Sequence, residues 1–173
     1  MDLKDCIRSL PDFPEKGIVF RDITTLLKDG EALRQAVDQL AEPFSKRPID
    51  LVTGIEARGF ILGPAVACQL GAGFVPIRKS GKLPAETLEK TYELEYGTDS
   101  LAMHVDAIED GETVLMVDDL LATGGTMEAS CEMVEQVGGK IAGCAFLVEL
   151  SFLQGREKLV GYDIHSLIDF ESE

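Results

Sequence analysis

The stretch "VLMVDDLLATGG", residues 114–125, joins an apolar run to two adjacent carboxylates and then to a turn of small residues. Its opening Val-Leu-Met-Val is typical of a strand that is buried on both faces of a parallel sheet. In an open parallel sheet, ligands bind at the carboxyl ends of the strands, which is where Asp118 and Asp119 fall. The stretch therefore predicts a strand that delivers two carboxylates to a binding site.

The residues after the two aspartates predict a phosphate-binding turn. Residues 123–126, Thr-Gly-Gly-Thr, lead into a helix, whose first backbone N–H groups lack partners and whose dipole attracts anions. Glycine lets the backbone approach a ligand closely, and the threonine hydroxyls are further donors. The two carboxylates could bind vicinal hydroxyls, and the adjacent turn could bind a phosphate. This combination suits a ribose 5-phosphate. The alternative is an ordinary strand–turn–helix in which the aspartates cap the helix.

Composition and charge limit the class of protein. The 173 residues suit one domain, and 45% hydrophobic with 27% charged residues is ordinary globular composition. A net charge of −15 disfavours nucleic acid and an anionic membrane surface as partners. Residues 1–10 lack the apolar core of a signal peptide, and the apolar run 60–70 is too short to span a bilayer. We therefore expect a cytoplasmic protein.

The four cysteines are expected to be reduced and mostly buried. Cys6, Cys68, Cys131 and Cys144 are far apart, and the sequence has no CxxC motif and no histidine at ligand spacing. That distribution suits structural thiols better than a zinc site or a disulfide framework.

Strand-like and helix-like segments alternate along the chain. The strand-like runs are residues 50–55, 73–78, 113–119 and 140–150, and the helix-like segments are residues 31–44, 58–71 and 126–139. This alternation predicts an α/β fold with a mostly parallel sheet covered by helices on both faces. Residues 11–24 are expected to be an irregular lead-in. Alternation within 80–112 predicts a two-stranded flap outside the core.

Beyond the opening motif, segments along most of the chain resemble a known family. "VLMVDDLLATGGT" resembles the phosphoribosyl-pyrophosphate (PRPP) signature of the type I phosphoribosyltransferases. Between about residues 6 and 160, further segments resemble the adenine-specific family in the same order: "IRSLPDFPEKGIVFRDIT" (7–24), "GIEARGFILGPAVA" (54–67), "IRKSGKLP" (77–84), "YELEYG" (92–97) and "LVELSFLQGREKL" (147–159). The resemblance implies the type I phosphoribosyltransferase fold as a single domain over residues 1–173, with an N-terminal hood of about residues 1–30 and a flexible β-flap of about residues 80–112 over the active site.

The same resemblance implies a reaction. Members of the family transfer the 5-phosphoribosyl group of PRPP to N9 of adenine, giving AMP and pyrophosphate in purine salvage. They depend on Mg²⁺, which is held mainly by PRPP and water rather than directly by the protein, and the family precedent is a homodimer. Two alternatives stay open: a different base, namely hypoxanthine, guanine, xanthine or orotate, or a non-catalytic PRPP sensor.

The resemblance also implies roles for individual residues. The ribose hydroxyls would be bound by Asp118 and Asp119, and the 5-phosphate by Ala122, Thr123, Gly124, Gly125 and Thr126. Pyrophosphate would be bound by Glu56, Ala57 and Arg58, in a loop that often has a cis peptide at Glu56–Ala57, and by Lys79 and Lys82. Ser80 stands where some relatives carry another basic residue. Adenine would be bound by Val19, Phe20, Arg21 and Leu150, with Phe20 stacking on the purine. Glu95 would be the general acid/base, and Tyr96 its neighbour on the flap.

Plainer interpretations exist for several of these residues. Phe20 lies in an apolar run, as an ordinary core residue would. Glu95 alternates with apolar residues, as does any solvent-facing strand residue. Arg58 and the lysines could simply be solvated.

Overall fold

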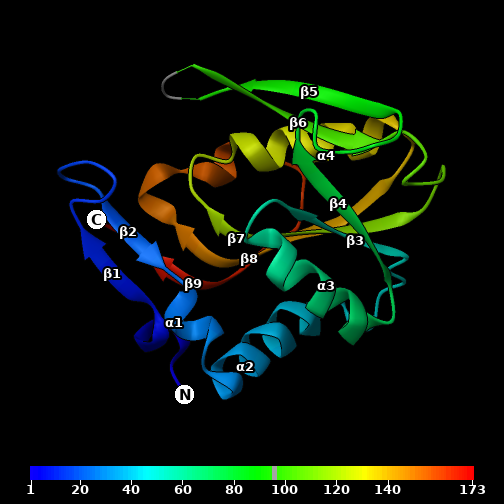
Figure 1. Ribbon diagram of the computed structural model, residues 1–173. Coiled ribbons are helices and arrows are strands. Elements are labelled where there is room, and N and C mark those ends of the chain that lie inside the picture. The colour runs from blue at the N-terminus through cyan, green and yellow to red at the C-terminus, as the bar shows by residue number, and fades with distance from the viewer. Residues whose placement is uncertain (95–96) are drawn as a thin grey trace.

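A seven-stranded sheet, in the order β5-β6-β4-β3-β7-β8-β9, forms the centre of the fold (Figure 1). The structure, a computed structural model, describes residues 1–94 and 97–173. The strands are β3 (Leu51–Ile55), β4 (Gly73–Lys79), β5 (Thr87–Glu93), β6 (Thr98–His104), β7 (Thr113–Leu121), β8 (Lys140–Leu150) and β9 (Ile164–Phe170). All neighbours from β4 to β9 in this order are parallel, whereas β6 is antiparallel to both β4 and β5. The predicted mostly parallel sheet is thus confirmed.

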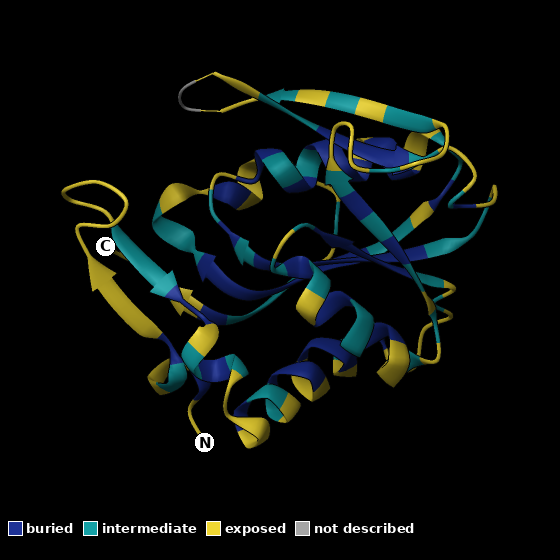
Figure 2. Ribbon diagram, in the orientation of Figure 1, coloured by how far each residue is buried: buried dark blue, intermediate teal, exposed yellow. Residues whose placement is uncertain are grey.

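Helices cover both faces of this sheet (Figure 1). The helices α2 (Gly30–Ala41) and α3 (Gly59–Leu70) pack on one face, and α4 (Gly125–Gln136) packs on the other. The buried side chains of β7 alternate accordingly, because Leu115 and Val117 join the α2–α3 side while Val114 and Met116 join the α4 side. Two covered faces explain why this strand is a continuous apolar run. Figure 2 shows the middle of the sheet as buried.

The N-terminal lead-in is more regular than predicted. β1 (Arg8–Pro11) and β2 (Val19–Asp22) form a separate two-stranded antiparallel sheet, followed by a short helix α1 (Thr24–Leu27). We call β1, β2 and their connection the hairpin. All of β1 is exposed and most of β2 is only half-buried, so the strands bury no apolar face that a period of two could reveal. The prediction of an irregular segment over residues 11–24 is therefore wrong for β2.

The predicted flap consists of β5 and β6, which pair antiparallel as expected. However, β6 also pairs with β4, so the two strands extend the central sheet. Leu101 and Met103 of β6 are buried in the core on the α4 side. The prediction that this segment lies outside the core is thus wrong for β6. Glu95 and Tyr96, which follow β5, lie outside the described residues.

The C-terminal part of the chain adds elements that the sequence patterns did not indicate. After β8 come two 3₁₀ helices, η3 (Ser151–Leu153) and η4 (Gly155–Leu159), and then the edge strand β9. The predicted helix over residues 31–44 is divided between α2 and a 3₁₀ turn, η2 (Glu42–Phe44). Pro43 lies two residues after the end of α2, and it lacks the N–H that a continuing α-helix would need.

All four cysteines are free thiols. Cys131 and Cys144 are buried with their sulfur atoms 3.8 Å apart, and Cys6 is partly buried. Cys68 lies on the solvent side of α3, so the expectation of buried thiols is wrong for it. Within the described part of the chain, no helix combines the length and hydropathy that a membrane span requires.

Candidate active site

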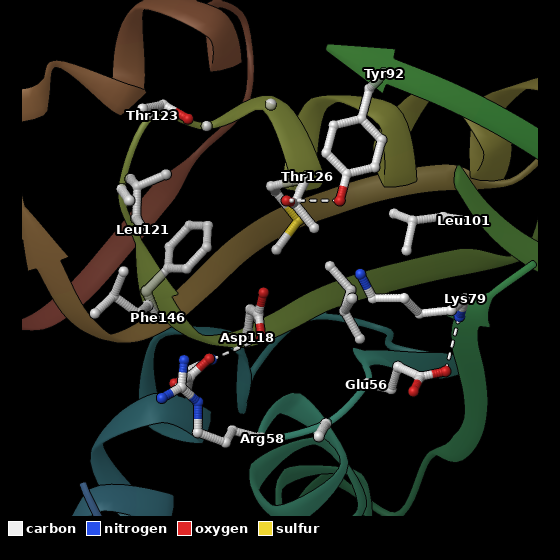
Figure 3. A pocket seen from close by; sticks show the side chains of 18 residues that line it. Glu56, Arg58, Lys79, Tyr92, Leu101, Asp118, Leu121, Thr123, Thr126 and Phe146 are labelled. Carbon is white, nitrogen blue, oxygen red and sulfur yellow. Dashed lines mark hydrogen bonds and ion pairs between the residues drawn. The ribbon is translucent and has the colours of Figure 1, made fainter. Parts of the chain in front are cut away.

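A cavity of about 290 Å³ opens at the carboxyl ends of β3, β4 and β7 (Figure 3). It is lined by the loop after β3, the end of β4, the flap strands, and the segment that connects β7 to α4. The lining residues are Ile55, Glu56, Ala57, Arg58, Lys79, Tyr92, Leu101, the continuous segment 118–127 and Phe146. The position agrees with the rule that ligands bind beyond the carboxyl ends of parallel strands.

The adjacent carboxylates lie inside β7 rather than after it. The strand continues to Leu121, which pairs with Glu149 of β8, so the predicted end at Asp119 is two residues short. The Asp119 N–H donates to Asp118 Oδ1 at 2.9 Å, and Arg58 Nε lies 2.7 Å from Asp119 Oδ2. That ion pair lacks hydrogen-bond geometry, and Asp119 Oδ2 is buried without a donor among the described residues. An acceptor of this kind is suited to a hydroxyl of a ligand.

The sequence around Arg58 leaves room for the carboxylates. A Cβ atom on Gly59, the first residue of α3, would lie 2.9 Å from Asp118 Oδ1. Glycine at this position therefore allows the helix to begin directly beside the carboxylate. Figure 3 shows the Arg58 guanidinium next to the carboxylates.

Burial changes the acidity of both aspartates. Removal from water holds the pKa of Asp118 well above its usual range, and the neighbouring Asp119 charge raises it further. Burial also raises the pKa of Asp119, although the Arg58 guanidinium opposes that shift. The ionised pair is thus costly in the folded protein, and groups that donate hydrogen bonds to it are favoured.

The predicted phosphate turn connects β7 to α4 and lines the same cavity. Gly124 has φ of 84°, in the left-handed region, and no side chain among the described residues caps the helix that begins at Gly125. The first N–H groups of α4 are thus positioned for an anion. On its other side the turn contacts η4 closely, since a Cβ on Gly124 would lie 2.4 Å from the Gly155 carbonyl oxygen.

The loop after β3 joins the cavity to β4. The Glu56–Ala57 peptide is cis, as in the loop of the family that the sequence resembles. The Glu56 carboxylate accepts from the Lys79 N–H at 2.7 Å and from Arg78 Nε at 3.3 Å. The Lys79 ammonium pairs with Asp99 of β6, a contact that raises the pKa of Lys79. The start of the loop is thus tied to β4, and β4 is joined in turn to β6.

Lys82 is not part of the cavity lining. It is exposed, and its carbonyl oxygen accepts a hydrogen bond from Arg78 Nη1 at 3.3 Å. The structure therefore brings Lys79, but not Lys82, to the predicted pyrophosphate-binding loop.

The residues predicted to bind adenine lie apart from the 290 Å³ cavity. Phe20 connects the hairpin to it, because the Arg58 guanidinium lies 5.4 Å from the Phe20 ring centroid. The Arg21 side chain points elsewhere and lies over the Phe170 ring at 4.0 Å. Leu150, at the end of β8, packs against the core on the α2–α3 side. Arg58 thus lies between the cavity that it lines and the Phe20 ring of the hairpin.

Sequence reasoning missed several lining residues. Phe146 pairs with Asp118 across β7 and β8, a neighbour relation that no local motif reveals. Tyr92 lies within "YELEYG", and its hydroxyl accepts from Thr126 Oγ1 at 3.3 Å, joining the flap to the phosphate turn. Asp99 was missed as well, although it holds Lys79. Alternation along the flap strands places Tyr92 on one face but cannot reveal which residue it meets.

Comparisons with known proteins agree over nearly the full length. Residues 24–168 match the phosphoribosyl transferase domain. An adenine phosphoribosyltransferase from Clostridium perfringens is 58% identical over 171 residues, 99% of each chain. The crystal structure of an adenine phosphoribosyltransferase from Thermoanaerobacter pseudethanolicus aligns with a TM-score of 0.94 and 56% identity, covering 97% of this chain and 98% of the other. The Saccharomyces cerevisiae adenine phosphoribosyltransferase, complexed with an imino-altritol bisphosphate and adenine, aligns with a TM-score of 0.90 and 40% identity, covering 95% and 96%.

Proposed function

The chain belongs to the phosphoribosyltransferase family, and on that premise we infer that it transfers the 5-phosphoribosyl group of PRPP to N9 of adenine. The products are AMP and pyrophosphate. The main support for this chemistry is that the Asp118–Asp119 pair lines the same cavity as the glycine turn at the start of α4. The carboxylates can accept hydrogen bonds from sugar hydroxyls, and the N–H groups of the turn can donate to a phosphate. Together these groups match a ribose 5-phosphate. The relatives named above support adenine as the base.

The cavity residues divide the work of binding PRPP. Backbone N–H groups of the Ala122–Thr126 turn hold the 5-phosphate, and the paired carboxylates accept from the ribose hydroxyls. Arg58, beside the carboxylates, and Lys79, at the end of β4, receive the pyrophosphate, with Lys82 reaching it when the flap closes. This arrangement fixes the sugar between two anion-binding regions, so that C1 faces the base.

The transfer step separates charge. Breaking the bond between C1 and pyrophosphate leaves positive charge on the ribose ring and negative charge on the leaving group. Arg58 and Lys79 stabilise the negative side, while the carboxylates face the sugar. The flap strands exclude water, which would otherwise attack C1 in place of N9 of adenine.

Mg²⁺ is the cofactor that the family typically uses with PRPP, and the residues present fit it. Asp118 and Asp119 offer carboxylate oxygens, the donor type that Mg²⁺ accepts directly or through water. Asp119 Oδ2 is buried without a hydrogen-bond donor in the described part of the chain. We assign the ion mainly to PRPP oxygens and water, with these carboxylates beyond them. When bound, it supplies positive charge against the charge that grows on pyrophosphate.

The hairpin reads the base. We propose that the Val19 carbonyl accepts from the N6 amino group of adenine and that the Arg21 N–H donates to N1, while Phe20 and Leu150 contact the purine faces. Hypoxanthine presents the inverse pattern of donors and acceptors at both positions, and backbone groups cannot exchange roles.

Glu95 acts as the general acid/base on the purine, with Tyr96 beside it on the flap. We further propose that the protein works as a homodimer in the cytoplasm.

Competing bases test the proposal. Purified protein is given PRPP, Mg²⁺ and either adenine, hypoxanthine or guanine, and formation of each nucleotide is measured. Adenine should be preferred by on the order of 10⁴ or more in kcat/KM, as in sites that discriminate by hydrogen bonding. Similar rates with hypoxanthine would refute the adenine assignment, and failure with every base would refute the transferase assignment.

A further inference from the structure

The hairpin leaves one edge of β2 without a partner strand. Val19 is opposite Pro11 in the β1–β2 register, and Phe20 is opposite Leu10. Proline has no N–H, so Val19 and Pro11 do not exchange the two hydrogen bonds of a bonded pair. In antiparallel sheets bonded and non-bonded pairs alternate. The backbone groups of Val19 and Arg21 therefore face the free edge of β2, where the purine is read.

A carboxylate from the far end of the sequence lies on this edge. The Val19 N–H donates to Glu173 Oε2 at 2.8 Å. Glu173 belongs to the segment after β9, and Figure 1 shows the C-terminus beside β2. The carboxylate is thus next to the Val19 carbonyl, to which the purine amino group is assigned.

The Arg21 side chain holds that segment in place. Its guanidinium donates to the Ser172 carbonyl oxygen at 3.2 Å and to Ser9 Oγ at 2.7 Å, and lies over the Phe170 ring. These contacts join β1, β2 and the end of β9. They position Glu173 on the strand edge and explain why the Arg21 side chain turns away from the cavity.

The geometry points to Glu173 as a specificity-determining residue that accepts a hydrogen bond from the 6-amino group of the purine, an inference that rests on the proposed function. The amino group carries two hydrogens, and one of them is assigned to the Val19 carbonyl. With N1 facing Arg21, the second hydrogen points along the strand toward the Val19 N–H, where the carboxylate lies. A carboxylate has enough lone pairs to accept from both.

The charge of Glu173 makes the contact selective. A hydrogen bond to a carboxylate is roughly twice as strong as one between neutral groups. A 6-oxo purine would instead direct an oxygen at the carboxylate, which adds repulsion to the mismatch at the backbone. Glu173 therefore favours 6-amino over 6-oxo bases beyond what the backbone of β2 provides.

Kinetics with two bases test this role. We compare Glu173→Ala with wild type on adenine and on unsubstituted purine, which has no group at position 6, under saturating PRPP. The kcat/KM for adenine should fall roughly 10- to 100-fold, as expected for a hydrogen bond to a charged group, while that for purine stays unchanged. Glu173→Gln, with one acceptor oxygen in place of two, should fall between wild type and Glu173→Ala. Glu171→Ala, in the same segment, is the matched control and should resemble wild type.

Two other kinetic results would overturn the inference. Equal losses with adenine and purine would mean that Glu173 only supports the hairpin, and would overturn the inference. A rise in kcat/KM for adenine would mean that Glu173 blocks access of the base to the edge of β2, and this result would also overturn the inference. If wild-type protein itself does not convert adenine and PRPP, the proposed function fails first, so the two failures are distinguishable.

Discussion

Gly155→Ala should displace the phosphate turn without changing any group that contacts a ligand. The Cβ atom of this alanine would lie 2.3 Å from the Ala122 carbonyl oxygen and 3.0 Å from Leu121 Cδ1. Ordinary contact begins near 3.4 Å, so the turn and η4 must separate by about 1.1 Å. Gly155 does not have a positive φ, and alanine therefore fits the backbone itself. The substitution should therefore change only the spacing between the phosphate turn and η4.

A shift of this size should be visible in catalysis. Displacing a binding element by about 1 Å costs up to roughly 10²-fold, so we expect kcat/KM for PRPP to fall by about that factor. Overpacking should also lower the free energy of unfolding by about 1–3 kcal/mol. Steady-state rates are measured well below the thermal midpoint of the variant, so that unfolding does not contribute.

A second glycine serves as the control for this experiment. A Cβ on Gly30, at the start of α2, would meet no heavy atom within 4 Å. Gly30→Ala should therefore match wild type in rate and be at least as stable, because alanine loses less backbone entropy than glycine on folding. If folded Gly155→Ala retains wild-type kcat/KM for PRPP, close contact with η4 does not set the position of the phosphate turn, and the reasoning fails.

Three further substitutions examine charges in and near the site. Asp118→Asn removes a partly buried carboxylate that lies beside the like charge of Asp119, so it should raise the thermal midpoint by about 2–4 °C per kcal/mol gained while slowing turnover. A lower midpoint in calorimetry would contradict this. Glu95→Gln should lower kcat by roughly 10²–10⁴ with PRPP binding unchanged, and an equally active variant would remove Glu95 from the chemistry. The Thr24 N–H and Arg8 lower the pKa of Asp22 from 3.8 to about 2, so the stability it contributes at neutral pH should be lost as pH falls from about 4 to about 2. Urea unfolding of Asp22→Asn across that range should show a weaker pH dependence than wild type, and parallel curves would refute the assignment.

Local sequence was sufficient to predict those parts of the fold and the site whose residues are neighbours along the chain. Asp118 and the turn before α4 are contiguous, and the apolar run before them marks a strand with two covered faces. Phe146 and Asp99 could not be placed in this way. Phe146 lines the cavity because β8 lies beside β7, and Asp99 meets Lys79 because β6 lies beside β4. Such strand order depends on packing across the whole sheet.

The hairpin and β9 were missed for a different physical reason. Their strands lie at edges, and much of their surface is exposed or half-buried, so their apolar residues do not follow a clear period. The contact between Glu173 and Val19 joins residues 154 positions apart in the sequence. Only the completed fold brings β9 close enough to the hairpin for this contact to form.

The cations of the cavity are already paired, Arg58 with Asp119 and Lys79 with Asp99. If these cations receive pyrophosphate, as proposed, the incoming anion would take the place of protein carboxylates instead of displacing dissolved counterions. Release of bound salt, which makes phosphate recognition by exposed lysines and arginines strongly dependent on ionic strength, then contributes little. In the proposed binding mode, Arg58 would turn to pyrophosphate and leave Asp119 free for the ribose hydroxyls, so that both ends of PRPP would be recognised together.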